Sequence, residues 1–166
     1  MENYDWSKFT QRIPIKATIQ EIYDYWTTQE GMEKWFLRLS EFYTSEKSLK
    51  NPTTPIQKGD TYKWMWHGYS DEVVEYGEIL EANGLDLLQF TFAEQCIVTM
   101  KIFGESEETI MELSQENIPT DDQSKVRFHL GCSNGWTFYL SNLKSILEGG
   151  IDLRNKNDKL KRMVNS

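Results

Sequence analysis

The C-terminal third of the chain carries a stripe of apolar side chains that strongly constrains the fold. The stripe follows the spacing i, i+3, i+4, i+7, i+10 and i+11, and consists of Trp136, Tyr139, Leu140, Leu143, Ile146 and Leu147. This spacing predicts one helix of about fifteen residues, from about Asn134 to Glu148, that ends at Gly149-Gly150. Because one full side of this helix is apolar, the rest of the chain has to supply a large apolar surface to cover it.

The middle of the chain predicts a β-sheet as that surface. Between Gly59 and Ser114 the apolar residues change to a period of two, which is typical of strands. The clearest segment alternates Tyr62, Trp64 and Trp66 with Lys63, Met65 and His67. Further strands are predicted at 7–16, 37–43, 73–80, 85–92, 96–103 and 109–113. Since the connections between them are mostly short, neighbouring strands are expected to pair antiparallel.

Two short helices are predicted directly after the first strand. Thr18 and Glu21 have the spacing of a capping box, in which each side chain satisfies a backbone N–H at the other position. The apolar face of the first helix contains Ile19, Ile22, Tyr23 and Trp26, and a second helix is predicted after a break near Thr27. The predicted fold class is therefore α+β: a curved antiparallel sheet of about six or seven strands, wrapped round a long C-terminal helix, with two short helices after the first strand.

Length and charge exclude several classes of protein. With 166 residues we expect a single domain spanning 1–166, with its core at about 7–148 and a basic tail at 151–166. A net charge of -8 argues against nucleic-acid binding, which needs a basic face. The sequence has no apolar run long enough for an integral membrane segment and no signal peptide, so a cytoplasmic protein is expected. The tail either docks on the acidic body or contacts an acidic partner or membrane surface.

Histidines and cysteines give no strong motif. His67 and His129 are the two histidines, and Cys96 and Cys132 the two cysteines, without the spacing of a metal site or a disulfide framework. We therefore expect no metal and no cofactor, and the thiols are predicted to be inert core groups. No nucleophile, dinucleotide or phosphate-binding motif of the common kinds is present either.

Several short motifs follow one another along most of the chain: Ile15-Lys16-Ala17 running into 18–28, Glu33-Lys34-Trp35-Phe36, the segment 58–66, Gly77-Glu78-Ile79-Leu80, Gly135-Trp136, Leu143-Lys144 and Leu147-Glu148. In the order and spacing of these motifs the chain resembles the activator of heat-shock-protein-90 ATPase homologue-like family within the START-like (SRPBCC) superfamily. The resemblance implies the helix-grip (START-like) fold, with a cavity between the sheet and the C-terminal helix that relatives often use for hydrophobic ligands.

The resemblance therefore favours a small binding module for a hydrophobic or lipid-like small molecule. The expected ligand-binding residues are Tyr62, Trp64, Trp66, Tyr76, Glu78, Trp136, Tyr139 and Leu143. The three residues of the 62–66 strand either line the cavity or fill the core. One alternative is a chaperone- or stress-associated protein-interaction domain that uses the acidic surface. Another is a cyclase- or aromatase-type enzyme with Glu78 or His129 as acid or base in the same cavity.

Overall fold

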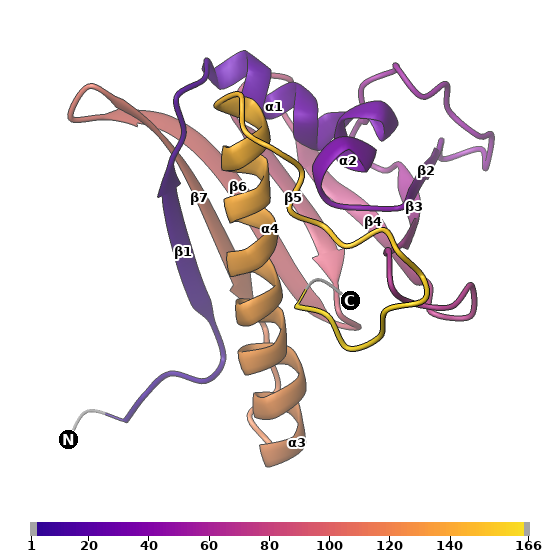
Figure 1. The fold of residues 1–166 in the computed structure, drawn as a ribbon, viewed down its shortest axis with the longest axis vertical. Coiled ribbons are helices and arrows are strands. Elements are labelled where there is room, and N and C mark those ends of the chain that lie inside the picture. The colour runs from indigo at the N-terminus through magenta and orange to yellow at the C-terminus, as the bar shows by residue number, and fades with distance from the viewer. Residues whose placement is uncertain (1–2, 165–166) are drawn as a thin grey trace.

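The computed structural model describes residues 3–164 and contains one seven-stranded antiparallel sheet (Figure 1). The strand order is β1-β7-β6-β5-β4-β3-β2. From β2 to β7 each strand pairs with the next one in sequence, and β1 pairs with β7 at the edge opposite β2. The strands are β1 (Phe9–Pro14), β2 (Leu39–Tyr43), β3 (Thr61–Met65), β4 (Glu75–Ala82), β5 (Leu87–Phe92), β6 (Cys96–Glu105) and β7 (Glu108–Glu116).

The two short helices lie between β1 and β2, as predicted. Helix α1 (Ile19–Thr27) begins with the predicted capping box, because the Thr18 hydroxyl accepts from the Glu21 N–H and a Glu21 carboxylate oxygen accepts from the Thr18 N–H at 2.7 Å. Helix α2 (Gln29–Trp35) begins with Thr28, whose hydroxyl accepts from the Gly31 N–H. Thr28 is both the C-cap of α1 and the N-cap of α2, so one helix ends and the next begins at this single residue.

The C-terminal helical run begins earlier than predicted. Asp121 caps α3 (Asp122–Ser124), which continues through a π-helical segment, η1 (Lys125–Leu130), into α4 (Gly131–Leu147). In η1 the backbone bonds skip one residue more than in an α-helix, as in the bond from the Gly131 N–H to the Val126 carbonyl. Because each turn of η1 contains more residues than an α-helical turn, the apolar residues of this segment do not follow a 3.6-residue period. The sequence pattern therefore did not predict the helical run before Asn134.

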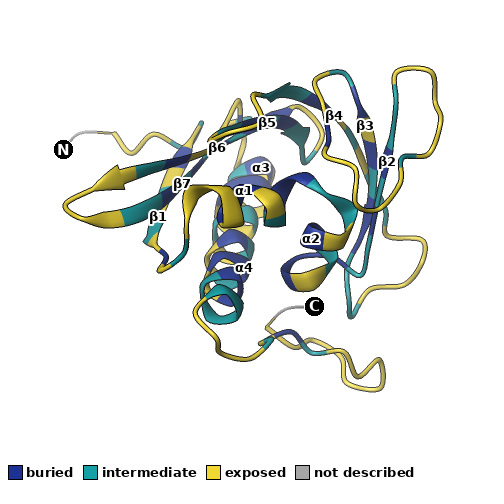
Figure 2. Cartoon of the chain, turned by 90° about the horizontal axis from the view of Figure 1, so that it is seen from above, coloured by how far each residue is buried: buried dark blue, intermediate teal, exposed yellow. Residues whose placement is uncertain are grey.

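Helix α4 lies across the concave face of the sheet and closes the core (Figures 1 and 2). Trp26 of α1 is completely buried, with its ring centroid 4.6 Å from that of Trp35 and 5.9 Å from that of Trp136. Leu140 and Leu143 are buried on the same side of α4. The predicted fold class is therefore confirmed: a curved antiparallel sheet, here of seven strands, holds a long C-terminal helix.

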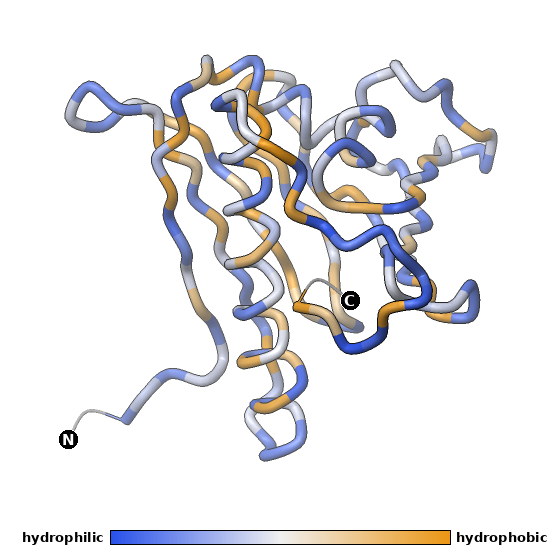
Figure 3. Tube along the Cα trace, in the orientation of Figure 1, coloured by the Kyte–Doolittle hydropathy of each residue, from blue (hydrophilic) through white to orange (hydrophobic). Residues whose placement is uncertain are grey.

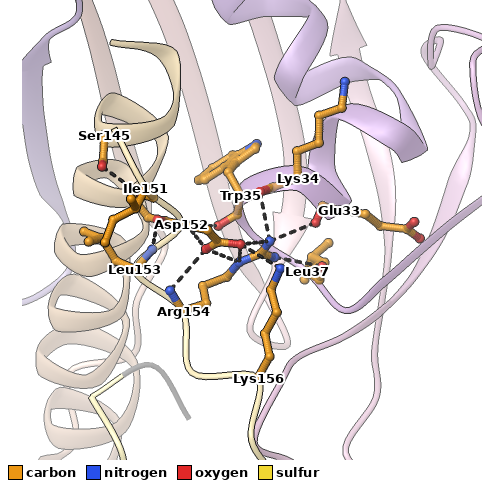
Figure 4. Close-up of polar contacts among 11 residues, drawn as sticks. Glu33, Lys34, Trp35, Leu37, Ser145, Ile151, Asp152, Leu153, Arg154 and Lys156 are labelled. Atoms are coloured by element: carbon orange, nitrogen blue, oxygen red, sulfur yellow. Dashed lines mark hydrogen bonds and ion pairs between the residues drawn. The ribbon is translucent and has the colours of Figure 1, made fainter. Parts of the chain in front are cut away.

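The chain after α4 turns back and docks on α2 (Figure 4). The Arg154 side chain is only 1% exposed and donates to the carbonyl oxygens of Glu33, Lys34 and Leu37 at 2.8–3.0 Å. It also pairs with Asp152 at 2.8 Å. Asn142 of α4 completes the arrangement by donating to the Trp35 carbonyl at 2.7 Å and accepting from the Leu153 N–H at 2.7 Å. We call Asn142, Asp152, Arg154 and the carbonyls they bind the tail clamp.

Charge and hydrogen bonding explain the strength of this clamp. Burial on its own would raise the pKa of Asp152, but hydrogen bonds from Arg154 and Lys156 hold that pKa well below its ordinary value. The carbonyls at the end of α2 carry the negative end of the helix dipole, so a buried guanidinium is favourable there. Beyond the clamp the tail is mostly hydrophilic, as Figure 3 shows. No helix in residues 3–164 is long and apolar enough to cross a bilayer.

Candidate functional site

A cavity of about 460 Å³ opens between the sheet and the N-terminal half of α4. The start of α4, the middle of η1 and the C-terminal tail form part of its walls. The rest comes from the residue after α2, the end of β5, and the segment between β3 and β4. The lining residues are Phe36, Trp66, Tyr69, Val73, Phe92, Arg127, Gly131, Cys132, Asn134, Gly135, Trp136, Tyr139 and Val164.

Aromatic rings that contact one another form most of this wall. The ring centroid of Phe36 lies 4.9 Å from that of Tyr139 and 5.8 Å from that of Trp66. Trp136 lies 5.0 Å from Phe36 and 5.4 Å from Phe92, so it joins them in one cluster. Most of these pairs are edge-to-face or tilted, the arrangements that aromatic quadrupoles favour. The wall is therefore held in place by its own packing and presents ring faces and edges to an apolar ligand.

Helix α4 borders the cavity with two glycines, Gly131 and Gly135. A Cβ atom added at Gly135 would meet no heavy atom within 4 Å beyond its own neighbourhood, so open space begins at the helix backbone. One turn further on, the same helix buries Leu140 and Leu143 in the core. The missing side chains at 131 and 135 keep the space between helix and sheet unfilled at this end.

Three polar residues interrupt the apolar wall: Arg127, Cys132 and Asn134. Burial raises the pKa of the Cys132 thiol to about 11, although a hydrogen bond with Gln115 works in the opposite direction. A thiol with this pKa is almost entirely protonated at neutral pH and is a poor nucleophile. The wall therefore offers binding contacts, and its thiol is not activated for catalysis.

Glu75 is a carboxylate near the cavity residue Cys132 and was not among the predicted site residues. It pairs across the sheet with Trp64 and shares the inner face with Ile79, and its side chain accepts from the Ala93 N–H at 2.8 Å. Burial raises the pKa of Glu75 above its ordinary value. The signal was available, because the two-residue period places Glu75 on the same face as the apolar Ile79.

The structure places the predicted ligand-binding residues in three different environments. Trp66, Trp136 and Tyr139 line the cavity. Tyr62, Trp64 and Leu143 are completely or almost completely buried in the core and are absent from the lining. Tyr76, which is 68% exposed, and Glu78 lie on the outer face of β4. There they border a separate surface depression, together with Tyr43 and Lys63.

Tyr62 owes its place in the core to a glycine on the neighbouring strand. Gly77 is its cross-strand partner, and a Cβ atom at Gly77 would come within 2.4 Å of the Tyr62 hydroxyl oxygen. The ring passes over this glycine, and its hydroxyl donates to the Thr91 carbonyl at 2.5 Å. Tyr62 therefore ties three strands together.

His129 also lies away from the cavity. It is buried against the N-terminal segment, where its Nε2 is 2.8 Å from the Tyr4 hydroxyl and its Nδ1 is 3.0 Å from the Trp6 carbonyl. These contacts assign it to holding residues 4–6 against η1. Within the described part of the chain, no group of three or more His, Cys, Asp or Glu side chains is placed to hold a metal ion.

Solved structures share this fold at low sequence identity. A protein of Staphylococcus saprophyticus, SSP2350, is 17% identical with a TM-score of 0.67, and the match covers 89% of this chain and 96% of that one. The Aha1 dimer from Colwellia psychrerythraea is 19% identical with a TM-score of 0.65, covering 86% of this chain and 97% of that one. DynU16, a protein from the dynemicin biosynthetic locus, is 16% identical with a TM-score of 0.65, covering 90% of this chain but 50% of that one.

At these identities the structural likeness supports the fold, and folds of this kind serve many functions. No curated protein matches the sequence. A protein family does: the one described as Activator of Hsp90 ATPase homolog 1-like protein matches residues 16–148. This match spans most of the chain, from the end of β1 to the residue after α4, and includes nearly all of the cavity wall. The chain therefore belongs to the Activator of Hsp90 ATPase homolog 1-like protein family.

Proposed function

We propose that this chain binds an apolar small molecule in the cavity between the sheet and the N-terminal half of α4. The observation that carries the proposal is the unfilled, aromatic-lined space itself. Its volume of about 460 Å³ falls within the range of roughly 300–1,000 Å³ that is usual for small-molecule sites. Trp66, Trp136 and Tyr139 are the expected contacts among the residues named from the sequence, and Phe36 and Phe92 join them.

The glycines of α4 give a second argument. Glycine in the middle of a helix is destabilising by roughly 0.5–1 kcal/mol relative to alanine. At Gly135 there is room for a methyl group, because no neighbouring heavy atom lies within 4 Å of where a Cβ atom would be. Packing therefore does not explain its presence, whereas a ligand that lies against the helix backbone would.

The test is a fluorescence titration with N-phenyl-1-naphthylamine, an uncharged aromatic probe that brightens in apolar sites. The native chain should bind the probe at one saturable site. Gly135→Leu places a side chain at the cavity wall and should weaken binding at least ten-fold. Ser141→Leu is the matched control, because it adds the same side chain to an exposed position of the same helix, outside the lining.

The two leucine variants separate binding in the cavity from binding elsewhere. If both variants bind the probe like the native chain, the probe does not occupy the cavity. If the native chain itself shows no saturable binding, the cavity is not a site for ligands of this class, and the proposal fails.

A further inference from the structure

One charged side chain lines the cavity. Among the described residues that line it, Arg127 alone carries a formal charge, and the other side chains are apolar, aromatic or neutral. A guanidinium at the edge of an aromatic pocket offers up to five N–H donors in a flat fork that matches a carboxylate, sulfonate or phosphate.

The π-helical segment η1 is what brings Arg127 to this wall. In an uninterrupted α-helix, nine residues at about 100° each would place Arg127 on the side of the helix opposite Trp136. In η1 each residue turns the chain by only about 80°, compared with about 100° in an α-helix. Over the four steps from Gly131 back to Arg127, this difference rotates the direction of Arg127 by roughly 80° relative to a regular α-helix. Arg127 then stands on nearly the same side of the run as Gly135, facing the cavity. A π-helical turn is rare and often marks a functional site.

Arg127 is only weakly engaged within the protein. Its Nη1 lies 3.6 Å from the Glu94 carboxylate, too far for a hydrogen bond, and both side chains are about two-thirds exposed. Exposed ion pairs of this kind contribute about 0–1 kcal/mol. Among the described residues, Glu94 is the only carboxylate within 4 Å of it. The guanidinium also lies 5.0 Å from the centroid of the Phe128 ring, a contact that leaves its N–H donors available to a ligand.

The C-terminal tail reaches the cavity at Val164. Val164 lines the cavity, and Arg162 precedes it by two residues, which limits the distance between their Cα atoms to about 7 Å. Residues 155–162 carry Lys156, Lys159, Lys161 and Arg162 against the single acidic residue Asp158. Of these cations, Lys156 pairs with Asp152 at 2.8 Å, and Arg162 is the one nearest in sequence to the cavity wall.

We infer that the ligand of this cavity is an anionic amphiphile: its apolar body lies against the aromatic wall, and its carboxylate, sulfonate or phosphate pairs with Arg127. The inference rests on the proposed function and adds the chemical class of the ligand. Arg127 is the residue that distinguishes such a molecule from a neutral one of the same shape.

Two probes with one ring system test this directly. 8-Anilino-1-naphthalenesulfonate carries the aromatic body of N-phenyl-1-naphthylamine plus one sulfonate. Arg127→Gln should weaken binding of the sulfonate probe about three- to five-fold, the effect of losing one partly exposed charge pair, and change binding of the neutral probe less than two-fold. Glu94→Gln should act in the opposite direction and strengthen binding of the sulfonate probe, because it removes the competing carboxylate.

Each outcome separates this inference from the proposed function. If the neutral probe binds but Arg127→Gln and Glu94→Gln leave both probes unchanged, the anionic ligand class is wrong and the cavity remains a binding site. If neither probe binds the native chain, the proposed function fails as well. Gly135→Leu should reduce binding of both probes, and a sulfonate signal that survives in that variant belongs to the surface. Glu94→Gln keeps the inference testable if Arg127→Gln does not fold.

Discussion

From Leu140 onward, α4 buries its apolar side against α2 and the sheet, whereas from Gly131 to Tyr139 the same helix borders an unfilled cavity. The packed half is fastened by the tail clamp, in which a completely buried guanidinium satisfies three carbonyls of the α2 end. The open half has glycines at the wall and one loosely paired arginine at the edge.

This difference shows how one helix can both stabilise a fold and leave room for a ligand. The clamp and the buried side chains of Leu140 and Leu143 fix the position of α4 relative to the sheet at its packed half. Because that position is fixed at one end, the other end does not have to collapse onto the sheet to keep the protein folded. The following changes should affect the two halves differently.

The largest expected effect is on the tail clamp. Arg154→Met keeps the aliphatic stem but leaves Asp152 and the α2 carbonyls without their buried donor. Removing one partner of a buried pair typically costs about 3–5 kcal/mol, so the free energy of unfolding in urea should fall by that amount. Lys156→Ala is the control, because Lys156 binds the same carboxylate from an exposed position and should cost less than about 1 kcal/mol. A similar small loss in both variants would contradict the role of the clamp.

Gly77→Ala should have the next largest effect. The added methyl group would lie within 2.4 Å of the Tyr62 hydroxyl, so the ring has to move and its hydrogen bond to Thr91 is strained. Overpacking of this kind typically costs about 1–3 kcal/mol, which urea denaturation would detect. An unchanged midpoint would mean that the packed region around Tyr62 tolerates an extra atom, against our description.

Gly135→Ala makes the same chemical change in the open half and should have the opposite sign. The methyl group enters open space, and alanine is the better helix residue by roughly 0.5–1 kcal/mol, so the protein should become more stable. The matched pair of alanine variants therefore compares a glycine in the packed sheet, Gly77, with a glycine at the open half of α4, Gly135. A loss of stability at Gly135 would show that the wall is already closed there.

The smallest effect concerns Glu75, beside the cavity. Because burial raises its pKa above the ordinary value near 4.5, the folded protein holds this proton more tightly than the unfolded chain. The carboxylate therefore destabilises the fold above its folded pKa, and this penalty disappears as the pH falls below 4.5. Glu75→Gln should stabilise the protein slightly at pH 7 and have less effect at pH 4, measured by thermal unfolding at both values. A destabilised variant at pH 7 would contradict this.

Asp152 in the clamp has the reverse linkage. Its pKa lies below the ordinary value near 3.8, so its contribution to stability is complete above pH 3.8 and declines as the pH falls further. The ionisation of Asp152 in the tail clamp thus stabilises the fold, whereas the ionisation of Glu75 near the cavity destabilises it.

Local signals in the sequence were sufficient for most of the fold. The capping box at Thr18, the apolar stripe of α4 and the alternation in β3 each depend on residues a few positions apart, and each predicted its element correctly. The π-helical start of the last helical run was not predicted, because its wider pitch leaves no 3.6-residue period. The clamp could not be predicted either, since Arg154 binds backbone carbonyls about 120 residues away, and carbonyls leave no mark in the sequence.

The candidate site was harder to predict than the fold. The aromatic residues of β3 share one face, but only the position of α4 decides that Trp66 borders the cavity while Trp64 is core. Arg127 belongs to no recognisable sequence motif, and its position at the cavity wall depends on the π-helical geometry of η1. The face occupied by Glu75 followed from the period of β4, whereas its distance from the cavity depends on the curvature of the sheet.

The indole groups of the six tryptophans allow the most direct test of the central claim, that the open half of α4 borders a ligand site and the packed half does not. We would record the indole N–H signals of ¹⁵N-labelled protein by NMR, assigned with single Trp→Phe variants, during a titration with N-phenyl-1-naphthylamine. The account predicts that the signals of Trp66 and Trp136 move, while those of Trp35, bonded to the Tyr25 carbonyl, and Trp6, at the N-terminal segment, stay in place. Equal movement of Trp35 or Trp6, or no movement of any indole at saturating probe, would contradict it.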